Sequence, residues 1–309
     1  MALHVIVGKG PVGSTTAEEL ARRGHDVRVL SRSGGTSADG VEHRQVDATD
    51  AHALTAATRG AAALYNAVNP AYHRWATDWP PVAAALLTAA ERTGAVLVTM
   101  SNLYGYGRPT GPMTAQSPLA ATDVKGRVRS HMWLDALAAH EAGRVRVTEA
   151  RAADFFGPQV PAAHSHLVRQ IASLRAGRRA WVVGDPDASR TWAYLPDVAA
   201  TLATLGTDER ALGRAWHVPS VAPRSQRQAL ADLAAAMSVP AVPVSGIPWP
   251  VLRAAGVVVP MMREVVAVRH QFDQEFVIDA RETSETFGLA ATPWREALAA
   301  TAGAVPVSG

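Results

Sequence analysis

The 309-residue sequence contains no cysteine. This absence excludes a disulfide-stapled scaffold, a zinc or iron–sulfur site with thiolate ligands, and a thiol nucleophile. No apolar run approaches the roughly 18 residues needed to cross a bilayer, and no basic segment precedes the first apolar run as in a secretory signal. The histidine, aspartate and glutamate residues show no metal-ligand spacing. We therefore expect a soluble, cytoplasmic protein with no membrane partner and no metal.

Lysine is also scarce. Lys9 and Lys125 are the only lysines among the 30 basic residues, and the arginines are scattered among 27 acidic residues, which leaves a net charge of +3. Because these charges form no run or stripe, we expect no nucleic-acid partner. A mildly basic protein does suit an anionic small molecule such as a phosphorylated cofactor. These features do not distinguish a monomer from a homodimer.

The order of apolar segments predicts the fold class. Hydrophobic residues make up 48% of the chain and charged residues 18%, which is typical of a globular protein. Buried strands are expected at residues 3–7, 26–30, 41–46, 61–68, 96–100 and 145–150. Helical patterns fill the gaps, notably at residues 82–93 and 120–142. Strands that alternate with helices predict a doubly wound parallel sheet of the Rossmann type, in the α/β class.

The alternation breaks after about residue 155, where proline becomes frequent and short strands mix with helices. We interpret this change as the start of a smaller α/β lobe that binds substrate. The predicted dinucleotide-binding domain comprises residues 1–156 and 190–218, and the predicted substrate-binding lobe comprises residues 157–189 and 219–309.

A glycine-rich loop follows the first predicted strand directly. Gly8, Gly10 and Gly13 form a Gly-x-Gly-x-x-Gly motif, with Pro11 and Val12 inside it, and a helical pattern comes next. In this context the first glycine permits a tight turn, the second lets a pyrophosphate approach the helix N-terminus, and the third lets helix and strand pack closely. The loop predicts a dinucleotide-binding site.

The end of the second predicted strand bears on which dinucleotide is bound. A site for NAD usually places an acid there for the ribose 2′-hydroxyl, whereas this chain has Ser31, Arg32 and Ser33. A guanidinium between two hydroxyls suits a 2′-phosphate, so we predict NADP(H). Asp47 and Ala48, after the third strand, are expected beside the adenine.

Several further segments resemble the short-chain dehydrogenase/reductase superfamily, in its extended, epimerase-like or atypical branch. The segments are the glycine loop and residues 46–48 (Val-Asp-Ala), 96–105 (Val-Leu-Val-Thr-Met-Ser-Asn-Leu-Tyr-Gly), 151–158 (Arg to Pro) and 190–199 (Arg-Thr-Trp-Ala-Tyr-Leu-Pro-Asp-Val-Ala). Extended members usually carry an earlier glycine at the position where this chain has Val7. In lacking that glycine the chain resembles the atypical members.

A second departure concerns the catalytic segment. The resemblance implies a general acid in a Tyr-x-x-x-Lys pair, about twenty residues after Tyr104, whose lysine also holds the nicotinamide ribose. Residues 120–129 (Ala-Ala-Thr-Asp-Val-Lys-Gly-Arg-Val-Arg) contain no tyrosine. Aligned on the helix that follows, Asp123 falls at the tyrosine and Arg127 at the lysine, with Lys125 between them. The usual proton donor is absent.

Three functions fit a chain of this kind. The first is an NADPH-dependent ketoreductase without the tyrosine; atypical superfamily members that reduce polycyclic aromatic polyketides (angucyclinone ketoreductases of antibiotic biosynthesis) resemble this chain, and there a substrate phenol is thought to assist. The second is an NAD-dependent nucleotide-sugar epimerase or dehydratase, which would depend on the missing tyrosine. The third is a non-catalytic NADP(H)-binding sensor. We predict the ketoreductase, with a small-molecule aromatic ketone as its substrate.

Candidate catalytic and cofactor residues lie at strand ends, where doubly wound sheets bind ligands. Ser101, Asn102 and Lys125 are the catalytic candidates. Further cofactor contacts are expected from Asn66, Asn69, Thr99, Phe155 and, again, Lys125.

The substrate candidates are apolar, as a bulky aromatic substrate requires. They are Pro70, Met113, Phe156, Trp181, Trp192 and Met262. A histidine could replace the missing acid. We interpret each of the histidines nearest the predicted site as a surface or core residue; they are His73, His131, His164 and His166.

Overall fold

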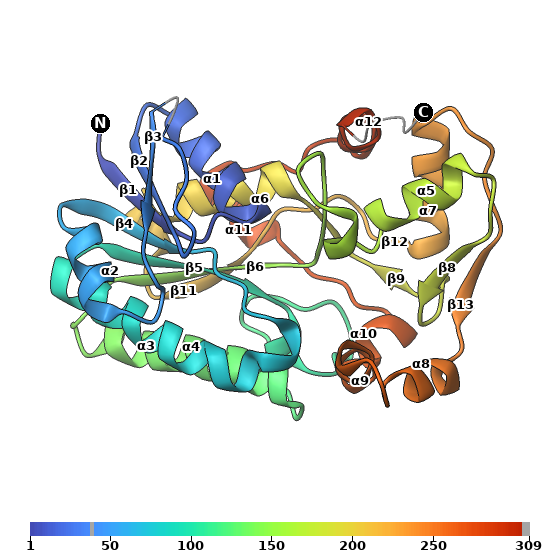
Figure 1. The fold of residues 1–309 in the computed structure, drawn as a ribbon, viewed down its shortest axis with the longest axis horizontal. Coiled ribbons are helices and arrows are strands. Elements are labelled where there is room, and N and C mark those ends of the chain that lie inside the picture. The colour runs from blue at the N-terminus through green and yellow to red at the C-terminus, as the bar shows by residue number, and fades with distance from the viewer. Residues whose placement is uncertain (38–39, 305–309) are drawn as a thin grey trace.

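The computed structural model describes residues 1–37 and 40–304. Its centre is a seven-stranded parallel sheet in the order β11-β6-β5-β4-β1-β2-β3, which confirms the predicted doubly wound α/β fold (Figure 1). The strands are β1 (Leu3–Val7), β2 (Asp26–Ser31), β3 (Val41–Gln45), β4 (Ala61–Asn66), β5 (Val96–Asn102), β6 (Val147–Ala152) and β11 (Arg214–His217). Because all seven strands are parallel, their carboxyl ends meet at one edge of the sheet.

Helices cover both faces of the sheet, so its central strands are continuous buried apolar runs. α1 (Pro11–Arg22) and α6 (Leu195–Leu205) pack together on one face, and α2 (Ala51–Thr58), α3 (Trp75–Thr93) and α4 (Val124–Glu141) cover the other (Figure 1). Each face has its own hydrophobic cluster.

Helix α3 begins seven residues before the predicted start at residue 82. Pro80 and Pro81 lie inside it, and proline removes a helical hydrogen bond, so the pattern was expected to begin after them. Trp75 and Trp79, which precede the prolines, are buried in the core. Burial of these two indoles stabilises a turn that local propensity disfavours.

The smaller lobe is built from short elements. β8 (Ala180–Val183) pairs in parallel with β13 (Val244–Ile247), and β9 (Ser189–Arg190) pairs antiparallel with β12 (Arg224–Ser225). Its helices are α5 (Ile171–Arg175), α7 (Gln226–Ala236), α8 (Trp249–Ala255), α9 (Pro260–Ala267), α10 (His270–Asp273) and α12 (Trp294–Ala304). The 3-10 turns in the described residues are η1 (Tyr72–Arg74), η2 (Tyr104–Tyr106), η3 (Ala162–His164), η4 (Val168–Gln170) and η5 (Glu209–Ala211).

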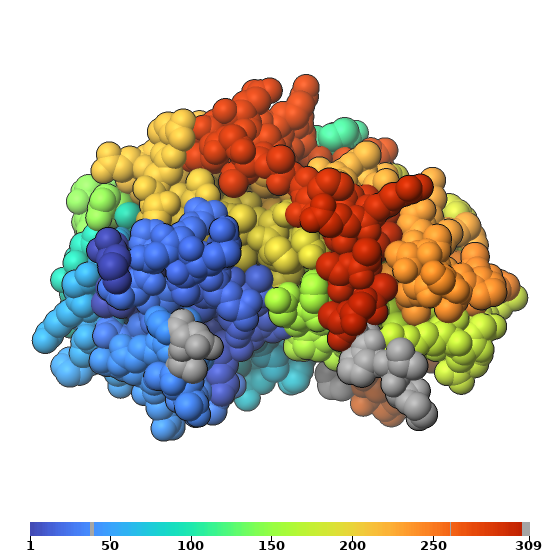
Figure 2. All heavy atoms as spheres, turned by 90° about the horizontal axis from the view of Figure 1, so that it is seen from above, coloured from blue at the N-terminus to red at the C-terminus, as the bar shows by residue number. Residues whose placement is uncertain are grey.

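Two connections join the lobes. β7 (Asp154–Phe156) and β10 (Trp192–Tyr194) pair in parallel where the chain leaves and re-enters the sheet domain. The C-terminal segment also lies between the lobes, as the space-filling view shows (Figure 2). Thr292 donates two hydrogen bonds to Asp197 on α6, at 2.9 and 2.6 Å, and the Trp294 indole donates to Asp232 on α7 at 2.8 Å.

One segment does not follow the predicted boundary. Residues 276–288 were assigned to the substrate lobe, but they run back along the sheet domain. The Met113 amide donates to the Val277 carbonyl at 2.8 Å, the Asp279 amide donates to the Met113 carbonyl at 2.7 Å, and α11 (Arg281–Phe287) packs on β11 (Figure 1). The reason is apolar burial, because Phe276 and Ile278 form a third hydrophobic cluster with Met113.

Candidate functional site

The glycine loop joins β1 to α1 at the carboxyl edge of the sheet. Gly8 has a φ of +110°, and a Cβ added there would lie 2.5 Å from the Ala67 carbonyl oxygen. A Cβ on Gly13 would lie 1.9 Å from the Gly8 carbonyl oxygen, whereas one on Gly10 would meet nothing within 4 Å. Gly8 and Gly13 are therefore required by packing, and Gly10 keeps the space above the helix open.

The N-terminus of α1 suits a pyrophosphate. Gly10 is the N-cap and supplies no side-chain hydrogen bond, Pro11 occupies the first turn, and that turn contains no acid. Its amide N–H groups and the positive end of the helix dipole are thus free to bind an anion. Val12 is half-buried and packs on the core. The residues present fit a dinucleotide at this position.

The segment after β2 forms a tight turn. The Ser31 hydroxyl donates to the Gly34 carbonyl at 3.2 Å, and Arg32 and Ser33 are exposed. Hydrogen bonds from Thr49 lower the pKa of Asp47, and the nearby Arg32 guanidinium lowers it further. The structure thus places Arg32 beside Asp47, and Ala48 follows, half-buried.

The predicted residues at the ends of β4 and β5 lie side by side. Asn66 is opposite Thr99 in the register of the two strands. Asn66 is buried, and its Oδ1 accepts the Val68 amide at 3.2 Å. Asn69 is exposed. The side-chain oxygen of Asn66 therefore stabilises the turn that follows β4.

The first two catalytic candidates lie at the end of β5. Ser101 is buried opposite Arg151 of β6. The Asn102 Oδ1 accepts the Tyr104 amide at 3.1 Å. Asn102 thus holds the turn into η2 with its amide oxygen, and its NH2 group can donate to a ligand.

Helix α4 presents a different pair of residues from the one aligned above. Asp123 is the N-cap and accepts the Gly126 amide at 2.9 Å, and Arg127 is exposed and donates to the Thr122 carbonyl. Lys125 and Arg129, four residues apart, form the buried face. Asp123 and Arg127, which were aligned with the Tyr-x-x-x-Lys positions, therefore lie off the buried face of α4.

Close packing sets this register of α4. A Cβ on Gly126 would lie 2.6 Å from the Tyr104 carbonyl oxygen, so the glycine lets the first turn of α4 contact η2. The following face of the helix then points into the domain.

Lys125 lies in an aromatic corner and is only 4% exposed. Its Nζ is 4.2 Å from the centre of the Tyr72 ring and 5.8 Å from that of Trp75. It also forms an ion pair with Glu264, which comes from α9 of the smaller lobe and is 30% exposed. The buried Lys125 ammonium therefore lies at the ligand edge of the sheet and also contacts the smaller lobe.

The tyrosine whose ring faces this lysine is hydrogen-bonded to a second tyrosine. Tyr72 donates to the Tyr104 hydroxyl at 3.1 Å. Burial raises the pKa of Tyr104 to about 12, helped by the charge of Asp154, and burial also raises the pKa of Tyr72. Both hydroxyls stay protonated at neutral pH, so each keeps an O–H group that can donate. Sequence reasoning missed Tyr72, although its place shortly after the β4 carboxyl end was a usable signal.

The smaller lobe adds a second charged pair. Arg190 forms an ion pair with Asp154 and stacks on the Phe272 ring at 4.9 Å. The charges of Asp154 and Arg190 both act on the pKa of His166, in opposite directions. The His166 ring centre is 5.1 Å from that of Phe272. Burial lowers the His166 pKa to about 4, so this histidine is neutral at pH 7. Sequence reasoning treated His166 as a surface or core residue. The structure places it near Asp154, whose charge also raises the pKa of Tyr104.

Three predicted substrate contacts are core residues instead. Met113, Phe156 and Trp192 are buried in the hydrophobic clusters. The Trp192 indole donates to the Arg224 carbonyl at 3.1 Å, and the Phe156 ring lies 5.0 Å from that of Trp294. These predictions are corrected, because each side chain fills space between packed elements and faces no cleft.

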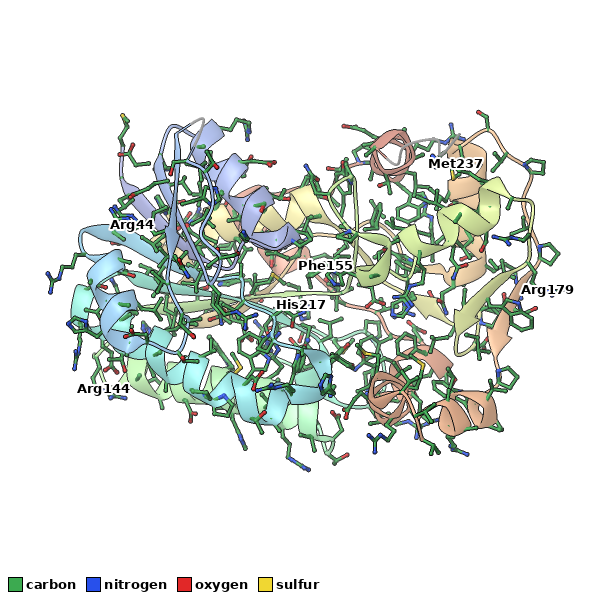
Figure 3. All side chains as sticks on the ribbon, in the orientation of Figure 1. Arg44, Arg144, Phe155, Arg179, His217 and Met237 are labelled. Carbon is green, nitrogen blue, oxygen red and sulfur yellow. The ribbon has the colours of Figure 1, made fainter. Side chains whose placement is uncertain are left out.

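Trp181 lies on the outer side of the smaller lobe, which does not fit a substrate contact between the lobes. It is exposed on β8, and Arg179, whose guanidinium lies 5.9 Å from its ring centre, is at the outer edge of the molecule (Figure 3). Phe155 lies between the lobes in the same view. Pro70 and Met262 are half-buried, and the Pro70 carbonyl accepts the Trp75 indole at 3.1 Å.

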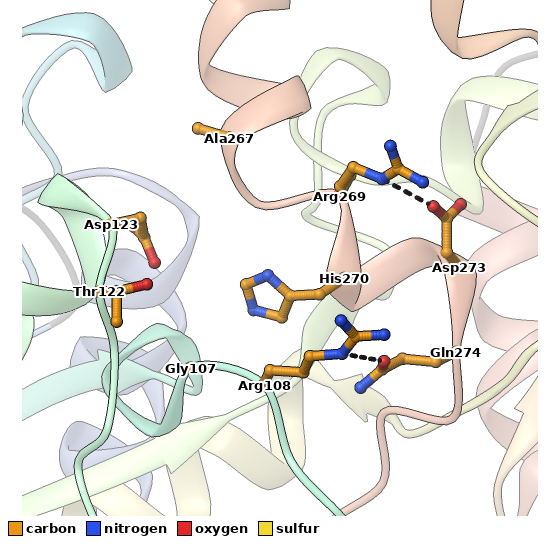
Figure 4. Close-up of a pocket in the computed structure, with 9 residues that line it drawn as sticks. All are labelled: Gly107, Arg108, Thr122, Asp123, Ala267, Arg269, His270, Asp273 and Gln274. Atoms are coloured by element: carbon orange, nitrogen blue, oxygen red, sulfur yellow. Dashed lines mark hydrogen bonds and ion pairs between the residues drawn. The ribbon is translucent and has the colours of Figure 1, made fainter.

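A cavity of about 400 Å³ lies next to the α4 N-terminus (Figure 4). It is lined by Gly107, Arg108, Thr122, Asp123, Ala267, Arg269, His270, Asp273 and Gln274. Arg108 donates to Gln274 at 2.9 Å, and Arg269 donates to Asp273 at 3.1 Å. The two lobes thus border a common cavity, and Asp123 in its lining is two residues from Lys125.

The sequence profile of the NAD dependent epimerase/dehydratase family matches residues 5–218, more than two thirds of the chain. The chain belongs to this family. Together with the glycine-loop geometry, membership supports a nicotinamide dinucleotide as the cofactor.

Solved structures share the fold over nearly the whole chain. UDP-glucose 4-epimerase of Thermotoga maritima with UDP-glucose has a TM-score of 0.80 at 16% identity and covers 98% of both chains. dTDP-glucose 4,6-dehydratase of Bacillus anthracis with NAD has 0.79 at 14%, covering 98% of this chain and 96% of that one. WbmH of Bordetella bronchiseptica with NAD+ has 0.73 at 20%, covering 98% of both. No curated protein sequence matches.

Two absences hold for the described part of this family member. None of its helices combines the length and the apolar character needed to cross a membrane. No group of three or more histidine, aspartate or glutamate side chains in it could hold a metal ion.

A buried polar chain lies behind the site in this family member. Because the Asp279 carbonyl can only accept, His217 donates to it through Nδ1, at 2.9 Å, and accepts the Tyr106 hydroxyl through Nε2 at 2.7 Å. Tyr106 in turn accepts from Arg151 at 2.8 Å, and Arg151 donates to Glu149 at 2.7 Å. Burial lowers the pKa of His217 to about 4, so its imidazole is uncharged at neutral pH.

We expect His166 and His217 to make the fold sensitive to acid. Each has a pKa of about 4 in the fold and about 6.5 when unfolded. Between these values the unfolded chain binds more protons, so stability falls as the pH falls from about 6.5 to 4, by up to ~1.4 kcal/mol per pH unit for each histidine. Unfolding in urea across this range measures the slope.

His217→Gln is the matched variant, since glutamine can donate to Asp279 and accept from Tyr106 without titrating. It should remove about half of the slope that the two histidines contribute. An unchanged slope would show that His217 does not stay neutral in the fold.

Proposed function

We propose that this protein is an NADP(H)-dependent ketone reductase that uses Lys125 where related enzymes use a tyrosine. The observation that carries the proposal is the position of Lys125: a buried ammonium on α4, over the ring of Tyr72 and at the ligand edge of the sheet, with the Tyr72 hydroxyl bonded to that of Tyr104. A cation so placed suits the oxygen of a carbonyl that gains negative charge during reduction.

The glycine-loop geometry supports the cofactor-binding roles in this proposal. Gly8, Gly10 and Gly13 admit the pyrophosphate to the α1 N-terminus, and Arg32 faces the 2′-phosphate. The bound dinucleotide supplies the hydride. Asn66 and Thr99 border the ribose, and Phe155 lies between the lobes near the reactive end.

The remaining residues position and protonate the substrate oxygen. Lys125 stabilises the developing alkoxide by charge. The Tyr72 hydroxyl donates a hydrogen bond to the Tyr104 oxygen, which leaves the Tyr104 O–H free to donate to the substrate oxygen. The raised pKa of Tyr104 keeps this hydroxyl protonated until the alkoxide forms. Ser101 and Asn102 complete the β5 end of the site.

We propose a polycyclic aromatic ketone of the polyketide type as the substrate. Phe155 between the lobes, and Met262 on the helix that carries Glu264, support an apolar substrate. An oxygen of the substrate replaces Glu264 at Lys125 in this proposal. The relatives bound to UDP-glucose favour a sugar nucleotide instead, but the tyrosine that this chemistry would require is missing from α4.

Turnover and cofactor preference can be tested together. Loss of NADPH absorbance with a hydroxylated polycyclic aromatic ketone, and formation of the alcohol, is the expected result. Arg32→Ala should weaken NADPH binding by about 10- to 100-fold, since hydrogen bonds to a charged group contribute ~1.5–3 kcal/mol, and should leave NADH binding unchanged.

Arg44→Ala is the control, because Arg44 is another exposed arginine of the same domain and pairs with Glu42 (Figure 3). Equal losses for NADPH and NADH in Arg32→Ala would contradict the phosphate role. NADPH binding without turnover would favour the sensor, and tight NAD retention with UDP-glucose binding would favour the epimerase.

A further inference from the structure

An apolar surface lies on the hairpin formed by α8 and α9. Nine large apolar side chains are exposed in the described part of the chain, and five of them lie between residues 251 and 261. Monomeric proteins rarely gather exposed apolar side chains so closely without a function. The five are Val251, Val257, Val258, Val259 and Met261.

The tip of this hairpin stands clear of the body. α8 and α9 pack side by side at the lower edge of the smaller lobe (Figure 1). Val257 and Val258, in the turn between them, are 81% and 79% exposed. Side chains this exposed touch almost nothing in the molecule itself, so they contribute little to its folding.

The backbone of the tip is already hydrogen-bonded. The amides of Gly256, Val257, Val258 and Val259 donate within the hairpin, to the carbonyls of Leu252, Ala254, Ala255 and Ala255, at 2.9, 3.2, 3.2 and 2.9 Å. An apolar phase excludes backbone groups that lack a partner. This turn can therefore move out of water into an apolar phase, because its amides already have hydrogen-bond acceptors.

The charges around the tip have one sign. Residues 248–263 contain two basic residues, Arg253 and Arg263, and no acid, and both arginines are exposed. The next acid, Glu264, turns inward to Lys125. The outer side of the hairpin thus combines an apolar tip with a positive flank.

We propose that the α8–α9 hairpin docks on an anionic lipid surface, with its valine tip in the headgroup region. Apolar insertion and attraction of arginine to anionic headgroups act together in such contacts. A second copy of the chain is the less favourable occupant, because a two-fold contact at the tip would bring the same arginines face to face.

This surface adjoins the candidate site, since α9 also carries Glu264, which forms the ion pair with Lys125. An apolar substrate dissolved in the lipid would then reach the cleft without crossing water. The docking proposal itself does not depend on the proposed reductase activity.

Co-sedimentation of the full-length protein with vesicles tests the proposal. Binding is expected to phosphatidylcholine vesicles that contain phosphatidylglycerol, to weaken as salt is raised, and to be far weaker with phosphatidylcholine alone. Val257→Asp with Val258→Asp should reduce binding by roughly tenfold or more. Leu134→Asp on α4 is the matched control, because Leu134 is exposed but lies on another helix.

Unchanged melting temperature and NADPH binding show that the double variant is folded. No sedimentation with the anionic vesicles would overturn the proposal, as would equal losses in Leu134→Asp. Concentration-dependent self-association that the double aspartate variant abolishes would assign the surface to a second copy and would also overturn it.

Discussion

Lys125→Met is expected to lower kcat for ketone reduction by about 10²- to 10³-fold, the usual loss when one donor to a developing oxyanion is removed. Methionine keeps the length and the apolar stem of lysine, so the packing against Tyr72 and Trp75 is retained while the charge is lost. Because the charge acts on the reaction more than on binding, KM should change less than kcat. Steady-state NADPH oxidation measures both.

Glu264→Gln distinguishes a catalytic from a structural lysine. This variant breaks the same ion pair but keeps the ammonium. If the pair serves only the fold, both variants lower stability and activity alike. If Lys125 faces the substrate oxygen, Glu264→Gln keeps turnover and Lys125→Arg restores part of it. Normal turnover by Lys125→Met would remove this residue from the mechanism.

The glycine loop provides the second large effect. Gly13→Ala should lower the melting temperature markedly and abolish NADPH binding, because the added methyl would lie 1.9 Å from the Gly8 carbonyl oxygen and the backbone cannot yield. A clash between an added methyl and fixed backbone typically costs about 1–3 kcal/mol or more. Thermal unfolding and NADPH titration are the measurements.

Gly10→Ala is the matched variant, because its methyl would meet no protein atom within 4 Å. We expect it to keep the melting temperature of the parent and still to weaken NADPH binding strongly, since the methyl fills the space that the pyrophosphate enters. Full NADPH affinity in Gly10→Ala would place the cofactor elsewhere.

The predicted elements that rest on local pattern agree with the structure. Each of the six expected strands is present in the central sheet within a few residues of its predicted bounds. A buried parallel strand is a short continuous apolar run, and this feature is readable from the sequence alone. The position of the glycine loop between strand and helix is equally local.

Predictions that needed side-chain direction were less accurate. The α4 helix was expected, but the face that it buries is set by the contact of Gly126 with Tyr104, which assigns the inner positions to Lys125 and Arg129. Apolar composition alone also placed Trp192 in the substrate site, although it packs in the core. Composition does not tell a core aromatic residue from a cleft aromatic residue.

The sequence by itself determined the doubly wound fold, the dinucleotide loop and the missing tyrosine, because each is a property of a short contiguous segment. The tertiary structure decided which groups lie together in the region where the tyrosine is missing. Tyr72, Tyr104, Lys125 and Glu264 come from four separate elements. Their approach depends on helix packing and on the return of the smaller lobe, and contacts between residues so distant in the chain leave no periodic signal in the sequence.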